Sequence, residues 1–170
     1  MGLIHLYCGN GKGKTTASLG LAIRAAGAGM QVVIVQFLKG MNSSETEIIR
    51  HINNITLLKY SFEYGFEYSG KKDEIIKIHN QLLNDSLKLV KNGKCDLLVL
   101  DEITYAYSMD LIDRSVIDNL ILKKPDELEL VLTGRNPADI MTENADYISE
   151  IKEVKHPFTK NISARKGVEF

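Results

Sequence analysis

Gly9-Asn10-Gly11-Lys12-Gly13-Lys14-Thr15-Thr16 is the stretch that decides the fold, because it joins an apolar, strand-like opening to a helical pattern. A glycine-rich turn that ends in Gly-Lys-Thr at the start of a helix is typical of proteins that bind nucleotide phosphates. Its backbone N–H groups converge on phosphate oxygens, and the helix N-terminus adds positive dipole character. Lys14 supplies a mobile cation, and the Thr15 hydroxyl can bind Mg²⁺. We therefore expect the phosphates of a nucleotide to be bound by Gly9, Asn10, Gly11, Lys12, Gly13, Lys14, Thr15 and Thr16.

The loop departs from the usual phosphate-loop pattern by one residue. That pattern has a glycine five residues before the Gly-Lys pair, where this chain has Cys8, and the glycine falls instead at Gly9. The loop therefore reads G-x-x-x-G-K-T, which is too short to wrap a triphosphate in the usual way. A turn that only joins a strand to a helix would not explain its lysines and glycines.

The composition is that of an ordinary globular chain of 170 residues, which we expect to form one nucleotide-binding domain over residues 1–170. The formal net charge is −1, so the charge does not favour nucleic acid as a partner. The longest apolar runs are the length of strands, and no signal peptide precedes the first strand, so we expect no membrane span. Cys8 and Cys95 are isolated thiols without metal-site spacing, and together these features predict a cytoplasmic protein.

Strand and helix signals alternate along the chain, as they do in parallel α/β proteins. The pattern predicts an α/β fold with a mainly parallel sheet flanked by helices, doubly wound or RecA-like with a phosphate loop. The run over residues 32–37 is typical of a strand covered on both faces, and residues 72–92 form the clearest amphipathic helix. Further strands are expected over residues 3–7, 55–60, 97–100, 129–132 and 147–154, the last at an edge, and further helices over residues 14–26, 43–51, 113–122 and 138–143.

Charged residues follow several strands at the edge where parallel sheets bind their ligands. Asp101 can hold Mg²⁺ directly or through water, and Glu102 can be a second metal ligand or a general base. Arg135 can bind a phosphate through two hydrogen bonds, whereas Lys39 either contacts substrate or lies in solvent. We expect catalytic roles for Lys14, Asp101, Glu102 and Arg135, and Mg²⁺ ligands in Thr15, Asp101 and Glu102.

Two further features leave alternatives open. The aromatic side chains of residues 60–68 either cover a sheet edge or subunit interface, which composition favours, or form a flat apolar wall for a large planar ligand. His156 can be a metal ligand or an acid–base group, but a lone histidine is more often structural.

These blocks together resemble the ATP:corrinoid adenosyltransferases of the phosphate-loop type, in order and almost from end to end. The shortened loop is itself a trait of that family. The resemblance rests on residues 9–16, VQFLKG at 35–40, LDEITY at 100–105, TGR at 133–135, ADYISE at 145–150, KHP at 155–157 and ARKGVE at 164–169.

The resemblance implies an unusual use of ATP. The 5′ carbon is attacked by cobalt(I) of a reduced corrinoid, the triphosphate leaves, and adenosylcobalamin forms, with ATP reversed relative to ordinary phosphate-loop enzymes. The implied substrates are ATP with Mg²⁺ and a corrinoid, the implied partner is an electron-donating reductase, and the implied assembly is a homodimer. Phe66 and Tyr68 match positions where the family places aromatic residues beside the corrin, although many relatives have tryptophan at the position of Tyr68. Many relatives also have an N-terminal extension that helps cover the corrinoid; because eight residues precede Gly9, we expect a more open site or one shared with a second subunit.

Two other classes of function fit part of the pattern. A phosphate-loop kinase or ATPase would direct attack at the γ-phosphate, with Glu102 as the base, and would release ADP, but the short loop counts against it. A non-enzymatic RecA-like nucleic-acid binder would need a basic stripe, and here the lysines are scattered among 22 acidic residues.

Overall fold

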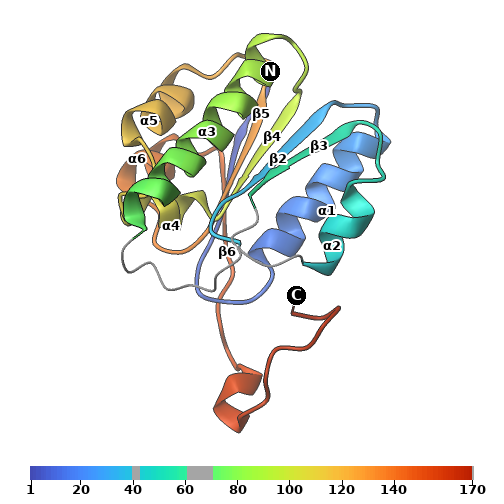
Figure 1. Ribbon diagram of the computed structural model, residues 1–170, viewed down its shortest axis with the longest axis vertical. Helices are drawn as coiled ribbons and strands as arrows, with labels where there is room; N and C mark the ends of the chain where they lie inside the picture. Colours follow the sequence, from blue (N-terminus) through green and yellow to red (C-terminus); the bar gives the residue numbers. More distant parts are fainter. Residues whose placement is uncertain (40–42, 61–70, 170) are drawn as a thin grey trace.

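The centre of the molecule is a six-stranded sheet in which every pair of neighbouring strands is parallel (Figure 1). The computed structural model describes residues 1–39, 43–60 and 71–169. The strand order is β3-β2-β4-β5-β1-β6, so the phosphate loop after β1 and the acidic pair after β4 are separated by one strand. The strands are β1 (Ile4–Cys8), β2 (Val32–Gln36), β3 (Ile55–Lys59), β4 (Leu97–Asp101), β5 (Glu129–Thr133) and β6 (Tyr147–Glu150).

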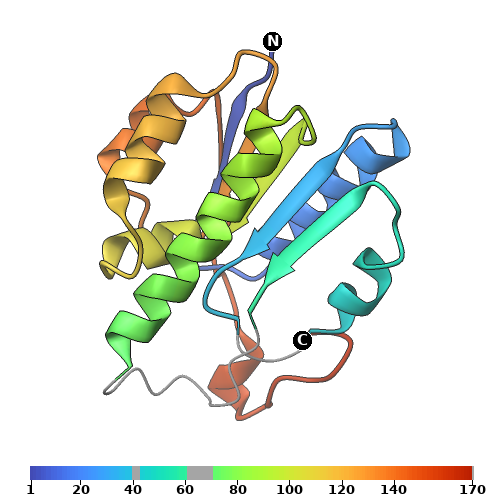
Figure 2. The same cartoon turned by 45° about the horizontal axis from the view of Figure 1, so that its top comes forward.

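Helices cover both faces of the sheet (Figure 2). Each face has its own apolar core. On one face α1 and α2 pack against alternate residues of the strands, including Val32, Ile34 and Val99. On the other face α3, α4, α5 and α6 pack against the intervening residues, including Val33, Val35 and Leu98. Burial on both faces explains why β2 and β4 are continuous apolar runs without alternation. The helices are α1 (Lys14–Gly27), α2 (Ser44–Ile49), α3 (Lys72–Lys91), α4 (Ile103–Ser108), α5 (Arg114–Lys123), α6 (Asp139–Asn144) and a 3₁₀ helix (Pro157–Lys160).

The observed elements confirm the predicted fold class, but α4 and the 3₁₀ helix were not predicted and one predicted strand was too long. The helix α4 was not predicted, because its sequence, ITYAYS, is short and rich in residues that favour strands. The strand predicted over residues 147–154 was too long, because β6 ends at Glu150. It lies at the edge of the sheet, as predicted, beside β1.

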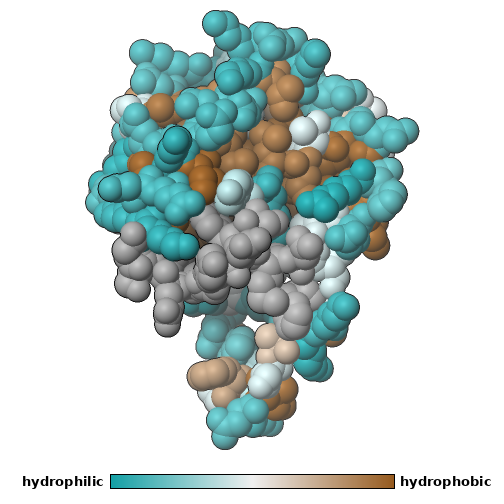
Figure 3. Space-filling model, in the orientation of Figure 1, coloured by the Kyte–Doolittle hydropathy of each residue, from teal (hydrophilic) through white to brown (hydrophobic). Residues whose placement is uncertain are grey.

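The chain beyond β6 leaves the sheet and ends in an exposed segment. Figure 3 shows apolar side chains on this projecting part of the surface, where Val154 is 87% and Phe158 is 76% exposed. Within the described ranges, no helix is both long enough and apolar enough to cross a membrane.

Candidate nucleotide-binding site

The phosphate loop lies between β1 and α1, and the segment after β6 holds it from one side. The Gly11 N–H donates a hydrogen bond to the Ile151 carbonyl (2.7 Å), and the Ile151 N–H donates one to the Cys8 carbonyl (2.8 Å). A Cβ atom on Gly9 would lie 2.5 Å from the Ile151 oxygen, and one on Gly11 would lie 2.8 Å from it. Both distances are shorter than real contacts, so these two glycines are needed for the close approach of the Ile151 backbone. The Gly11 N–H is therefore bonded within the protein, and the N–H groups that we expect to face a phosphate are those at the first turn of α1, which have no helical partners.

The Lys14 ammonium lies inside the loop. It donates hydrogen bonds to the carbonyl oxygens of Gly9 (2.8 Å) and Gly11 (2.9 Å), and the residue is only 6% exposed. Burial lowers the pKa of Lys14, and the nearby carboxylate of Glu102 opposes that shift. The loop thus surrounds a cation at the positive end of a helix, an arrangement suited to a polyanion.

Thr15, Lys39 and Asp101 meet at the carboxyl edge of the sheet. The Thr15 hydroxyl donates to Asp101 Oδ1 (3.0 Å), and the Lys39 ammonium donates to Thr15 Oγ1 (3.0 Å) and pairs with Asp101 Oδ2 (2.8 Å). The Asp101 side chain is fully buried, and the Thr133 hydroxyl from β5 also donates to its Oδ1 (2.7 Å). The carboxylate of Asp101 is therefore fixed by the phosphate-loop helix, by β5 and by Lys39 in the segment after β2.

Glu102 adopts a left-handed backbone conformation (φ 62°) between β4 and α4. Its N–H donates to Thr133 Oγ1 (3.0 Å), which ties this turn to the end of β5. Burial and the neighbouring Asp101 raise the pKa of the Glu102 carboxyl, while Lys39, Lys14 and Arg135 oppose the shift. The left-handed turn directs the chain away from the sheet and places two carboxylates beside one cluster of cations.

The structure brings most of the predicted residues to one place. Lys14, Thr15, Asp101 and Glu102 gather there, and Arg135, although exposed, is close enough to lower the pKa of Lys14. Lys39, for which the sequence left two alternatives, lies in the site and not free in solvent. Asn10, Lys12 and Thr16 are exposed on the loop and the first turn of α1, and Lys12 pairs with Glu169 (3.5 Å). Phe66 and Tyr68, the predicted corrinoid contacts, lie outside the described residues.

Three residues of the site were not predicted: Thr133, Ile151 and Gln36. A strand-end threonine and a backbone carbonyl carry no sequence signal for such roles. Gln36 is the last residue of β2, after four apolar residues, and it pairs in register with Asp101. A polar residue at the end of a strand that is buried on both faces was the sequence signal that could have identified it. Gln36 is 2% exposed, and among the described residues neither of its amide atoms has a hydrogen-bond partner.

The donor set at Thr15 and Asp101 fits Mg²⁺. A hydroxyl and a carboxylate are the hard oxygen ligands that this ion prefers, and the Lys39 ammonium already places a positive charge within 3.0 Å of both. Among residues 1–39, 43–60 and 71–169, no three His, Cys, Asp or Glu side chains form a metal-binding group. Mg²⁺ commonly takes only one or two carboxylates from a protein and its other ligands from substrate phosphates and water, so the small donor set is compatible with that ion.

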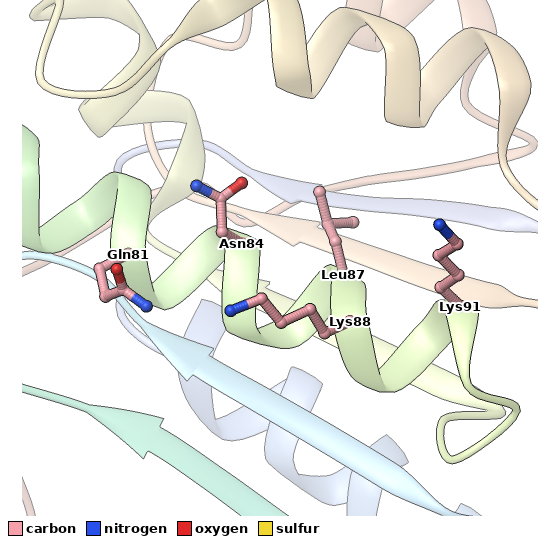
Figure 4. A pocket seen from close by; sticks show the side chains of 5 residues that line it. All are labelled: Gln81, Asn84, Leu87, Lys88 and Lys91. Carbon is pink, nitrogen blue, oxygen red and sulfur yellow. The ribbon is translucent and has the colours of Figure 1, made fainter.

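Two other features lie away from this site. A shallow pocket runs along α3 and is lined by Gln81, Asn84, Leu87, Lys88 and Lys91, all from that one helix (Figure 4). His156 begins the 3₁₀ helix, where its Nδ1 accepts a hydrogen bond from the Phe158 N–H (3.2 Å). The structural interpretation of His156 is therefore supported by a capping contact.

The fold and the phosphate loop define the class of protein: a RecA-like phosphate-loop protein. In keeping with this, the chain is similar in structure to a KaiC-like protein from Pyrococcus horikoshii, with a TM-score of 0.54 and 17% identity over 89% of this chain and 73% of the other. That likeness concerns the fold alone.

The family follows from sequence comparison. A model of the family "ATP:corrinoid adenosyltransferase BtuR/CobO/CobP" matches residues 1–170, and the chain belongs to this family. It is 35% identical to a corrinoid adenosyltransferase of Sinorhizobium sp over 99% of this chain and 80% of that protein. It is 32% identical to one of Pseudomonas aeruginosa (99% and 84% covered) and 28% identical to one of Escherichia coli (99% and 86% covered). The chain is therefore a transferase that uses ATP to adenosylate corrinoids, as the resemblance of its motifs predicted.

Proposed function

We propose that this enzyme transfers the 5′-deoxyadenosyl group of ATP to cobalt(I) of a reduced corrinoid and releases intact triphosphate. Cobalt(I) supplies the electron pair of the new cobalt–carbon bond, and the bond between the 5′ carbon and its oxygen breaks with its electrons going to the triphosphate. The product is an adenosylcorrinoid, adenosylcobalamin when the substrate is cobalamin. The observation that carries this proposal is the group of cations and oxygen ligands around Lys14, Thr15 and Asp101, which suits a polyphosphate leaving group, in a chain of this family.

The chain's own residues supply charge stabilisation and positioning. The Lys14 ammonium and the N-terminus of α1 would stabilise the negative charge that grows on the triphosphate as it leaves. The exposed Arg135 guanidinium, two residues after β5, could also bind these phosphates. Lys12, Gly13, Thr15 and Thr16, with the exposed side chain of Asn10, would complete the phosphate-binding set around Lys14, whereas Gly9 and Gly11 would allow the close approach of the Ile151 backbone.

Mg²⁺ would be held by Thr15 and Asp101, with Glu102 close to it. When bound, this ion neutralises charge on phosphate oxygens. The reaction as written moves no proton, so Glu102 is not needed as a general base. We assign Glu102 instead to the outer ligands of the metal, where its raised pKa reflects burial next to Asp101.

The corrinoid is assigned to the aromatic segment that contains Phe66 and Tyr68. Apolar rings there would exclude water from a strongly reducing metal and would favour loss of its lower axial ligand.

Because cobalt must reach the +1 state, we expect an electron-donating reductase to act with this enzyme. We also expect a homodimer, which light scattering of the purified protein would detect.

The test is a product analysis under anaerobic conditions. The protein is mixed with ATP, Mg²⁺ and chemically reduced cobalamin, the cobalt spectrum is followed, and the nucleotide products are separated. We expect adenosylcobalamin and inorganic triphosphate in equal amounts. Formation of ADP and phosphate without alkylated cobalamin would show instead that attack occurs at the γ-phosphate.

A further inference from the structure

We propose that Lys39 and Mg²⁺ compete for the same two oxygen atoms, Thr15 Oγ1 and an Asp101 carboxylate oxygen, so that Lys39 sets how tightly the site binds metal. The inference rests on the proposed function only for the identity of the metal site. Lys39 is accordingly a positioning residue for the metal–nucleotide complex.

The contacts of Lys39 are those expected of a metal ion at this position. Its ammonium lies 2.8 Å from Asp101 Oδ2 and 3.0 Å from Thr15 Oγ1, while the Thr15 hydroxyl is 3.0 Å from Asp101 Oδ1. The Asp101 side chain is fully buried and that of Lys39 is 23% exposed, so the lysine supplies the countercharge of a carboxylate that water cannot reach. The lone pairs that accept these contacts are the ones a metal would use.

The backbone brings Lys39 to this position. The Phe37 N–H donates to the Asp101 carbonyl (3.1 Å), so the pairing of β2 with β4 continues one residue beyond β2. Leu38 then adopts a left-handed conformation (φ 60°), which is uncommon for a residue with a branched side chain, and it is buried. This turn directs Lys39 back over the carboxyl edge of the sheet. A strained backbone next to a site residue indicates that the position of that residue is under constraint.

The other charges nearby explain why one cation must leave. Lys14 interacts electrostatically with both Asp101 and Glu102, Lys59 interacts with Asp101, and Arg135 interacts with Glu102. A divalent ion added to this set is repelled by every lysine and arginine in it. We therefore expect Mg²⁺ alone to bind weakly, and Mg²⁺ with a triphosphate to bind well, because the polyanion offsets the cations and accepts the displaced ammonium. The buried amide of Gln36, paired in register with Asp101, provides a further acceptor at this edge.

The first experiment measures metal binding without ATP or corrinoid, so that it does not depend on the reaction. Thermal unfolding and calorimetric titration with MgCl₂, at constant ionic strength, are compared for the wild type, Lys39→Met and Lys88→Met. Lys88 is the matched control, because it forms a lysine–aspartate pair with Asp85 (2.9 Å) on the exposed face of α3.

In EDTA we expect Lys39→Met to melt at a lower temperature than the wild type. Addition of Mg²⁺ should raise the melting temperature of Lys39→Met by more than that of the wild type. Its apparent dissociation constant for Mg²⁺ should fall about tenfold or more, which is the change expected when a competitor that holds the site most of the time is removed. Lys88→Met should respond to Mg²⁺ as the wild type does. An equal or weaker affinity for Mg²⁺ in Lys39→Met would overturn the proposal.

The wild-type protein provides a second measurement if Lys39→Met does not fold. Lysine acetylation followed by mass spectrometry should show faster labelling of Lys39 when Mg²⁺ is added, because the ammonium is released from Asp101. Unchanged or slower labelling of Lys39 would also overturn the proposal. Failure of adenosyl transfer in the product analysis, with the Mg²⁺ response as expected, would leave the competition in place and reject only the proposed chemistry.

Discussion

Replacement of Gly11 by alanine tests whether the phosphate loop is held by the segment after β6. The added Cβ would lie 2.8 Å from the Ile151 oxygen, 2.8 Å from the Lys152 carbonyl carbon and 2.9 Å from Ile151 Cγ2. Two of these atoms are backbone, so they cannot move aside by a change of rotamer. Either the loop or residues 151–152 must shift, and the shift breaks the hydrogen bond from the Gly11 N–H to the Ile151 carbonyl (2.7 Å).

The expected loss has two parts. Overpacking in a tight contact typically costs about 1–3 kcal/mol. Loss of the hydrogen bond adds about 1 kcal/mol. The free energy of unfolding should therefore fall by about 2–4 kcal/mol, and at about 2–4 °C per kcal/mol for a chain of this size the melting temperature should fall by roughly 4–16 °C. Because typical domains are stable by about 5–15 kcal/mol, the variant should still fold.

The assay is thermal unfolding of Gly11→Ala without nucleotide, followed by an ATP titration. Gly20→Ala is the control, because Gly20 lies within α1 and a Cβ there has no neighbour within 4 Å. That control should be as stable as the wild type or more stable by up to about 1 kcal/mol. If Gly11→Ala melted like the wild type and lost only ATP affinity, Gly11 would serve the approach of phosphate and the reasoning from Ile151 would be refuted.

Three further predictions concern charge, pH and the corrinoid. Lys14→Ala should lower the rate of adenosylcorrinoid formation at least about a hundredfold, as expected for a lost electrostatic stabiliser, and near-normal turnover would contradict that role. Burial lowers the pKa of His79 from 6.5, so the unfolded chain binds more protons and the free energy of unfolding should fall as the pH drops below 6.5, by at most about 1.4 kcal/mol per pH unit. Urea titrations of His79→Gln should lose this slope, whereas His51→Gln, at an exposed position, should keep it. Phe66→Ala should lower the efficiency of the reaction with corrinoid about ten- to hundredfold and leave the affinity for ATP unchanged. If the variant instead lost affinity for both substrates equally and melted at a lower temperature, Phe66 would have only a structural packing role.

The fold could be predicted because burial on two faces leaves a strong signal. The apolar runs of β2 and β4 and the glycine-rich turn before α1 predict a parallel sheet with a phosphate loop, and both are present. The helix α4 could not be predicted, because local preference opposes it. Its helical form is stabilised by burial of Ile103, Thr104 and Ala106 against the sheet, which is a tertiary effect.

The sequence could predict that several charged side chains lie near the phosphate loop, but it could not predict their contacts or the parts played by Thr133, Ile151 and Gln36. Strand ends are brought to one edge by the parallel topology, and this was enough to group Lys14 with Asp101. The sequence left Lys39 open because its position depends on the left-handed turn at Leu38, a conformation that leucine rarely adopts. The segment around Phe66 lies outside the described residues, so the corrinoid site stays a prediction.

The block at residues 145–150 illustrates how a segment without reactive chemistry can still determine a site. Asp146 accepts a hydrogen bond from the Ile4 N–H (2.8 Å), and this contact joins the start of β6 to the start of β1. The two strands then pair from His5 with Tyr147 to Cys8 with Glu150, so their register fixes where Ile151 lies relative to the loop. One residue further on, the Ile151 carbonyl accepts a hydrogen bond from the Gly11 N–H. That N–H is therefore not available to a phosphate. We expect a loop that is held in this way from one side to offer its remaining donors, from Lys12 onwards, to only part of a polyphosphate. This gives a physical reason why a shortened phosphate loop and an edge strand near the C-terminus belong to the same pattern.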